Sequence, residues 1–294
     1  MSHNNSLNCR GLDNVAIIDS STHSQEEEKK FGRICSASDV QLVKHFLSLI
    51  PMWTTILVVG LVLSTGDTFF PDQGTNMESS DFLVSLFILK SLSRRMGSSL
   101  LLILVHSEWI PKAKRKTAIQ VGIWAGIVSS ILCSSVGWQV EHRRTTIIRD
   151  NGLSNIKPDD YRTIPMSIFW LSPQFFLLGL TEGLVATGLD EFIVDQFQDP
   201  WKEYVSEINE FVIGLGNFLS MLFIQANKNL FGDTLNNSRL NEYYHRLTIV
   251  SYVNMLFFFS VIYIFYGSRY PNISGGTKCC IIPAAARLRV SEKE

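Results

Sequence analysis

The chain is patterned in long apolar segments separated by polar stretches, without strand-like alternation inside the segments. Because a bilayer core about 30 Å thick takes roughly 20 helical residues to cross, an apolar segment of that length predicts a transmembrane helix. Lipid supplies no partners for unpaired backbone groups, which also favours helix. Five segments without a charged residue fit this pattern, the last so short that its helix is expected to begin upstream: Phe46–Gly66, Thr117–Val140, Thr163–Thr181, Leu247–Ser268 and Phe211–Asn227.

A sixth apolar segment, Phe82–Val105, is interrupted by Lys90, Arg94 and Arg95. Neither flank alone is long enough to cross a bilayer, so the whole segment is predicted to form one span. The expected fold is therefore an all-α membrane protein with six transmembrane helices. This bundle is expected to occupy residues 41–268, between a polar segment of residues 1–40 and a polar tail of residues 269–294.

Lysine and arginine are distributed unevenly between the alternate connections of these spans. With the N-terminus inside the cell, the inner segments hold 15 of the 26 basic residues and the outer loops hold 8. This bias predicts that both ends of the chain lie in the cytoplasm. The outer loop Lys228–Arg246 contains the glycosylation sequon Asn236-Asn237-Ser238, whose use the sequence leaves open. The outer loop between the third and fourth spans is expected to be Glu141–Arg162.

Composition narrows the classes of function. The net charge of −1 lacks the basic excess that a nucleic-acid partner requires. The six histidines are scattered and the five cysteines form no Cys-x-x-Cys pair. No catalytic triad, Walker motif or metal-ligand cluster is visible, so neither an enzyme nor a bound metal is expected. Cys133 lies inside an apolar segment and is expected to pack in the core.

Several short motifs stand in a fixed order relative to these spans. Those at the entry to the first span are Arg10-Gly11-Leu12-Asp13-Asn14-Val15-Ala16-Ile17, Cys35-Ser36-Ala37-Ser38-Asp39-Val40, Lys44 and Leu49-Ile50-Pro51-Met52-Trp53. Those after it are Phe69-Phe70, Gln73-Gly74-Thr75-Asn76-Met77, Trp170-Leu171-Ser172-Pro173-Gln174-Phe175, Gly179-Leu180-Thr181-Glu182-Gly183, Glu191-Phe192, Asp195-Gln196, Asn237-Ser238-Arg239-Leu240 and Tyr243-Tyr244. From about Leu12 to Tyr266, the chain resembles the plant nitrate/peptide transporter family, proton-dependent oligopeptide transporters of the major facilitator superfamily.

The resemblance implies that this chain corresponds to helices 7–12 of a twelve-helix transporter, with residues 1–40 as the linker between its halves. It implies proton-coupled transport of a small polar solute such as nitrate, a di- or tripeptide or a related metabolite. The mechanism would be alternating access of two six-helix halves around a site near the midplane. The proton would be the coupling ion, with no other cofactor. Plasma membrane and vacuolar membrane both remain open.

The chain also departs from the family pattern. The Glu-x-x-Glu-Arg motif of the first helix and the lysine of the fourth helix have no counterpart here. His106-Ser107-Glu108-Trp109 stands where relatives often have Tyr-Asp-Arg. The alternative to a transporter is therefore a truncated, non-transporting half, or a subunit that needs an N-terminal half.

Glu182 is the foremost candidate for a functional residue. An ionisable group inside an otherwise uncharged span is costly enough to indicate a function. A desolvated carboxylate suits reversible protonation. The resemblance likewise implies that this position lines the central cavity and contacts substrate. The alternative is a carboxylate that is hydrated or paired near the inner mouth.

Lys90 and Arg94 are four residues apart and share one helix face. Counting from Phe82, Arg94 lies about 18 Å along the helix, near the midplane. These cations are expected either to attract an anionic substrate or to pair with Glu182. The alternative is that the span begins later and both side chains lie among lipid headgroups.

Other candidates are weaker. Asp199-Pro200 reads as a helix N-cap and first-turn proline. The acidic stripe behind it forms either a gate at the cytoplasmic mouth or a solvated helix start, and consists of Glu203, Glu207 and Glu210. Three further positions fit the family pattern for substrate contact, with packing as the alternative, namely Trp53, Gln174 and Asn217.

Overall fold

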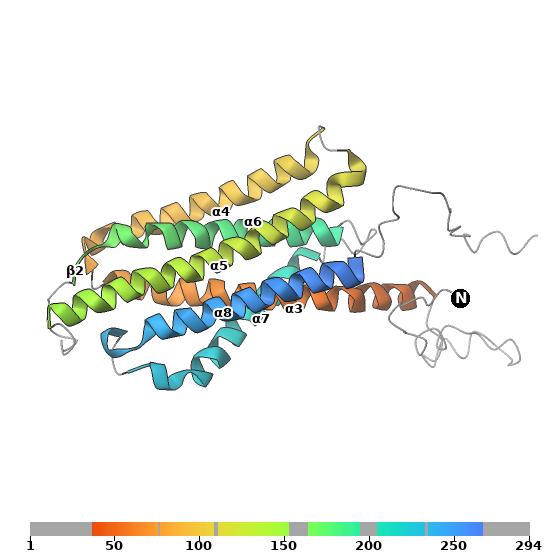
Figure 1. Cartoon of the computed structure of the whole chain (residues 1–294). Coiled ribbons are helices and arrows are strands. Elements are labelled where there is room, and N and C mark those ends of the chain that lie inside the picture. The colour runs from red at the N-terminus through yellow and green to blue at the C-terminus, as the bar shows by residue number, and fades with distance from the viewer. Residues whose placement is uncertain are drawn as a thin grey trace, which may run out of the picture.

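The computed structural model describes residues 37–75, 77–108, 111–152, 164–194, 205–232 and 235–266. Long helices run back and forth through this part of the chain (Figure 1), so that α3 begins and α8 ends at the same end of the bundle. The helices are α3 (Ala37–Thr75), α4 (Leu83–His106), α5 (Lys112–Asp150), α6 (Ser172–Val194), α7 (Val205–Ala226) and α8 (Leu240–Val261). The all-α fold predicted from the sequence is confirmed.

Five of these helices are long and apolar enough to cross a membrane, and α4 is the exception. At 24 residues α4 is also long enough, but it carries Lys90, Arg94 and Arg95. It packs along most of α6, which itself has the composition of a membrane-spanning helix. This packing supports α4 as the sixth span.

The helices pack in a definite order. α6 lies between α4 and α5, α5 packs against α8, and α3 contacts both α7 and α8. Large apolar side chains remain exposed on the outer faces of α4, α7 and α8, including Ile103, Phe218 and Leu256. Such exposure is expected of a surface that faces lipid instead of water.

The start of α6 differs from the prediction. Helix was expected from Thr163, but Ile164–Ser167 forms strand β2, which pairs in parallel with β1 (Met77–Glu78). A 3₁₀ turn, η3 (Ile168–Leu171), follows before α6 begins. Pro165 has no N–H to donate and fits an extended segment, whereas Pro173 suits the first turn of a helix. Both prolines lie in the same apolar segment, so apolarity alone did not distinguish the strand at Pro165 from the helix start at Pro173.

The predicted outer loop beginning at Glu141 is also wrong in its first part. α5 continues without interruption to Asp150, which makes it 39 residues long, or about 58 Å. Charged residues ended the apolar pattern at Val140, but a helix satisfies its own backbone and can continue beyond the lipid. α3 likewise extends past Gly66 to Thr75, and α8 begins at Leu240 instead of Leu247. Residues 1–36 and 267–294, which include most of both predicted tails, lie outside the described residues.

Candidate functional site

Four charged side chains from three helices meet within the bundle. The Glu182 carboxylate on α6 lies 3.1 Å from Nη1 of Arg94 and 3.5 Å from Nζ of Lys90, both on α4. Lys90 Nζ also donates a hydrogen bond to Oδ1 of Asp67 on α3. Of the alternatives that the sequence left open for Lys90 and Arg94, the structure shows the ion pairs with Glu182, and Asp67 is an addition to them.

The cluster lies far from the ends of its helices. Glu182 is near the middle of α6, and Arg94 is near the middle of α4. Charges at such depth are stable only when they are paired or reached by water. The Glu182 side chain is 24% exposed and that of Arg94 is 51% exposed, so the cluster is accessible from outside the described bundle.

Glycines on α6 position the two cations. A Cβ atom on Gly179 would collide with the carbonyl oxygen of Lys90, and one on Gly183 would collide with that of Arg94. Small residues four apart let two helix backbones approach closely, as in other membrane-helix pairs. Ser98 on α4 also donates a hydrogen bond of 3.3 Å to the Gly183 carbonyl oxygen. This close approach brings Lys90 and Arg94 within reach of Glu182.

The pairing is asymmetric. Lys90 lies between two carboxylates, those of Asp67 and Glu182. Arg94, by contrast, has Glu182 as its only carboxylate partner within 4 Å among the described residues. A loss of charge at Glu182 would therefore leave Lys90 paired and Arg94 without a counter-ion.

The other predicted contact residues do not join this cluster. Trp53 and Asp67 are both on α3 but about 21 Å apart along the helix axis. Gln174 is at the start of α6, where Nε2 donates a 3.1 Å hydrogen bond to Oε1 of Gln73. Asn217 is exposed on α7. These residues keep their predicted roles only as proposals.

The predicted acidic gate is partly outside the described residues, because Glu203 and the Asp199-Pro200 pair precede α7. Glu207 lies in the first turn of α7, and Glu210 follows one turn later. Both side chains are exposed. This position is compatible with either interpretation of the stripe, a gate or a solvated helix start.

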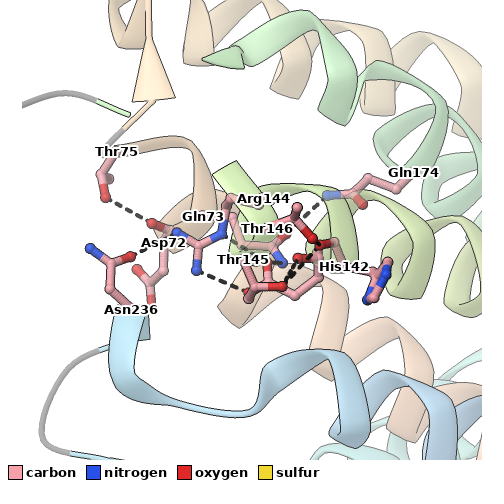
Figure 2. Close-up of polar contacts among 10 residues, drawn as sticks. Asp72, Gln73, Thr75, His142, Arg144, Thr145, Thr146, Gln174 and Asn236 are labelled. Carbon is pink, nitrogen blue, oxygen red and sulfur yellow. Dashed lines mark hydrogen bonds and ion pairs between the residues drawn. The ribbon is translucent and has the colours of Figure 1, made fainter. Parts of the chain in front are cut away.

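A second polar network has a fully buried centre, and the sequence reasoning missed it (Figure 2). Arg144 on α5 donates two hydrogen bonds to the Glu141 carboxylate, of 2.8 and 3.0 Å, and both side chains are 0% exposed. Glu141 also accepts a 2.7 Å bond from Nε2 of Gln73 on α3, and the network continues through Gln73 to Gln174 on α6. On its other side, Nη1 of Arg144 donates a 2.8 Å bond to Oδ1 of Asn236. The network thus connects three helices and the segment before α8.

The sequence did contain a signal for this network. Glu141 and Arg144 are three residues apart directly after an apolar segment, the spacing of neighbours on one helix face. The two residues between them, His142 and Arg143, are charged or titratable and exposed, so the whole run resembled a solvated loop. Nearby, Cys133 is buried as expected and its Sγ donates to the Gln174 carbonyl oxygen at 3.4 Å.

A third group of charges lies at the opposite end of the bundle from Glu141. Arg115 at the start of α5 donates a 3.0 Å hydrogen bond to Glu191 near the end of α6. His106, the last residue of α4, lies 4.0 Å from the same carboxylate. Within the described ranges, no group of three or more His, Cys, Asp or Glu side chains has the arrangement of a metal site.

Comparison with known proteins identifies relatives of this chain. No family model matches it. The chain is 29% identical over 273 residues to Protein NRT1/ PTR FAMILY 5.5 of Arabidopsis thaliana, covering 89% of this chain and 51% of the relative. It is 30% identical over 239 residues to Protein NRT1/ PTR FAMILY 5.10 of the same plant, covering 75% of this chain and 42% of the relative. With Protein NRT1/ PTR FAMILY 8.1 it shares 26% identity over 282 residues, 90% of this chain and 47% of the relative.

These matches confirm the resemblance found in the sequence. The chain spans about half the length of the curated relatives it matches. Together with the apolar helices, they make this an integral multi-pass membrane protein.

Proposed function

Starting from its similarity to the plant NRT1/PTR proteins, we propose that this chain is one six-helix half of a proton-coupled transporter. The order of its motifs supports assigning it to the C-terminal half. Its substrate is a small polar solute, with nitrate and di- or tripeptides as the leading candidates. It works by alternating access, in which the helices open a central site to one side of the membrane and then to the other.

The observation that carries this proposal is the pairing of Glu182 with Lys90 and Arg94. Ionisable groups deep in membrane helices are retained for proton or solute movement more often than for stability. Glu182 supplies a group that gains and loses a proton. Arg94 supplies a cation, and Glu182 is the only carboxylate among the described residues that pairs with it.

The asymmetric pairing suggests how proton and solute are coupled. When Glu182 is protonated, it no longer neutralises Arg94, while Lys90 keeps the carboxylate of Asp67. The guanidinium of Arg94 then binds the nitrate ion or the carboxylate of a peptide, for which its planar fork of N–H donors is suited. Release of the anion and of the proton restores the Glu182–Arg94 pair. One proton and one anionic group therefore enter and leave together.

Uptake into proteoliposomes tests this function. The chain is reconstituted alone and together with the N-terminal half of an NRT1/PTR relative, and uptake of labelled nitrate and of a labelled dipeptide is measured under an imposed proton gradient. We expect saturable, proton-driven uptake that Glu182→Gln abolishes. The matched control is Glu242→Gln, which removes an exposed carboxylate paired with Arg239 at the start of α8. Uptake by Glu182→Gln equal to that of the unmodified chain would contradict the proposal.

A second possibility is a half that does not transport by itself. The chain spans 51% and 42% of the relatives in the first two comparisons, which is compatible with this possibility. Uptake that begins only when the N-terminal half is added supports this possibility and leaves the role of Glu182 intact. Absence of uptake in both preparations would contradict both.

A further inference from the structure

The segment between α7 and α8 is held against the bundle at several points. Arg246 on α8 donates a 2.5 Å hydrogen bond to Oδ1 of Asn227, where the segment begins. Further along, the Arg239 amide donates to the Leu230 carbonyl oxygen at 2.7 Å, and the buried Leu230 side chain packs in the core. These contacts fold the segment back on itself and onto α8. We call its described residues, 227–232 and 235–239, the strap.

One side chain links the strap to α5. Oδ1 of Asn236 accepts the 2.8 Å hydrogen bond from Nη1 of Arg144, while Nε and Nη2 of Arg144 are directed at Glu141. Figure 2 shows Asn236 reaching toward Arg144 from the segment before α8, with Gln174 on the far side of Arg144. The Arg144 side chain is 0% exposed and Asn236 is half-buried, so this bond closes the outer side of the buried Glu141–Arg144 pair.

The same asparagine is the acceptor position of the sequon Asn236-Asn237-Ser238. Glycan transfer requires the asparagine amide and the serine hydroxyl to be presented together on an accessible, extended segment. Here residues Leu235–Asn237 form a 3₁₀ turn, η6. Ser238 is 6% exposed, and its Oγ accepts a 3.0 Å hydrogen bond from the Gly232 amide. A glycan is bulky and belongs on an open surface.

We propose that Asn236 is a structural catch that fastens the strap to the buried Glu141–Arg144 pair, and that its sequon is not glycosylated because the fastened strap keeps Ser238 buried. The asparagine is needed at this position because it offers a neutral acceptor to a guanidinium whose charge Glu141 already balances. This assignment rests on the contacts of the strap alone and does not depend on the proposed transport function.

Glycosidase treatment of the full chain, produced in a eukaryotic membrane system, tests the modification. The control is Leu153→Thr, which creates a new Asn-x-Thr sequon at Asn151, just after α5 and at the same end of the bundle as Asn236. Gly152 has open space around it, and Asn151 is exposed. We expect glycosidase treatment to leave the electrophoretic mobility of the natural chain unchanged. The same treatment should shift the mobility of the Leu153→Thr chain by the mass of one glycan. A shift of the natural chain that Asn236→Gln removes would overturn the proposal.

Releasing the catch should make the sequon available. The double variant Glu141→Gln/Arg144→Gln removes both charges together, so that neither is left buried without a partner. In the Leu153→Thr background we expect this variant to gain a second glycan, because the strap is no longer held. If the Leu153→Thr chain carries one glycan and the double variant in that background also carries only one, the view that the Arg144 contact protects the sequon would be contradicted.

Thermal unfolding tests the catch independently of glycosylation. Asn236→Ala removes the acceptor of Arg144, and we expect Tm to fall by at least about 2–4 °C. Asn237→Ala is the matched control, because it removes an exposed amide from the next residue of the same turn. Equal melting temperatures for the two variants would overturn the structural role, whatever the glycosylation result.

Discussion

Ion pairs in this protein differ in burial, and burial decides what each can do. Glu141 and Arg144 are both fully buried, whereas Arg239 and Glu242 form a pair whose side chains are 71% and 46% exposed. The Glu182 pairs lie between these extremes. In a half-exposed ion pair, the carboxylate can bind a proton or the cation can bind a solute in place of its partner. In a buried pair, neither residue can do so without unfolding its surroundings.

We predict that Arg144→Met lowers the free energy of unfolding by about 3–5 kcal/mol, because it leaves the Glu141 carboxylate buried without its counter-ion. Arg239→Met is the control, and its effect should be about 1 kcal/mol or less because its pair is solvent-exposed. Unfolding of both variants in mixed micelles measures the difference. Similar losses would show that burial of the Glu141–Arg144 pair has no energetic consequence.

Residue by residue, the sequence was informative where a charge interrupted an apolar segment. Glu182, Lys90 and Arg94 were found in this way, because each lies in a largely apolar segment. Glu141 and Arg144 were missed because exposed polar residues lie between them and the pattern could not show which charges face inward. Periodicity gives a helix face, but only tertiary packing decides whether that face is covered.

Among the elements, the α4–α6 pair is the one that builds the candidate site. Its two backbones approach at Gly179 and Gly183, whose missing side chains leave room for the carbonyl groups of Lys90 and Arg94. The contact resembles the close crossings that small residues allow in membrane helices. A wider crossing would draw the cations of α4 away from Glu182.

We predict that Gly183→Ala destabilises the protein by about 1–3 kcal/mol through overpacking and lowers proton-driven uptake by separating Arg94 from Glu182. Gly214→Ala on α7 is the control, because a Cβ atom there meets nothing within 4 Å. Melting temperature and uptake are measured for both variants. An unchanged Gly183→Ala protein would contradict the packing of α4 on α6.

The prediction of elements succeeded for helix type and failed at helix ends. Every predicted apolar span overlaps a helix, yet α5 and α3 continue beyond the apolar pattern and α6 begins at Ser172 instead of Thr163. Hydropathy indicates which residues face lipid. The ends of a helix are set by capping residues, prolines and tertiary contacts, which hydropathy does not report. The short pairing of β1 with β2 depends on residues far apart in sequence and could not be predicted locally.

For the whole molecule, the number of membrane crossings depends on α4. Among the helices that the structure describes, five have the composition of a span, and α4 has the length but carries three cations. Two of these cations are neutralised by Glu182 and, for Lys90, also by Asp67. The bundle therefore compensates within itself for charges that lipid would not accept.

We predict that the two ends of α4 lie on opposite sides of the membrane. Asp81→Cys and Glu108→Cys, each in a background without the native cysteines, place exposed labels just before and just after this helix. A membrane-impermeant thiol reagent should label them from opposite sides of sealed vesicles. Labelling of both from one side would mean that α4 does not cross.

The central claim is that Glu182 and a solute anion compete for Arg94. Binding of labelled nitrate to the purified protein, reconstituted with an N-terminal half, tests this as a function of pH. We predict that binding to the unmodified protein strengthens as the pH falls, and that Glu182→Gln binds at every pH as the unmodified protein does at low pH. Arg94→Gln should bind weakly throughout. A Glu182→Gln protein that loses binding, or one that keeps the original pH dependence, would contradict the claim.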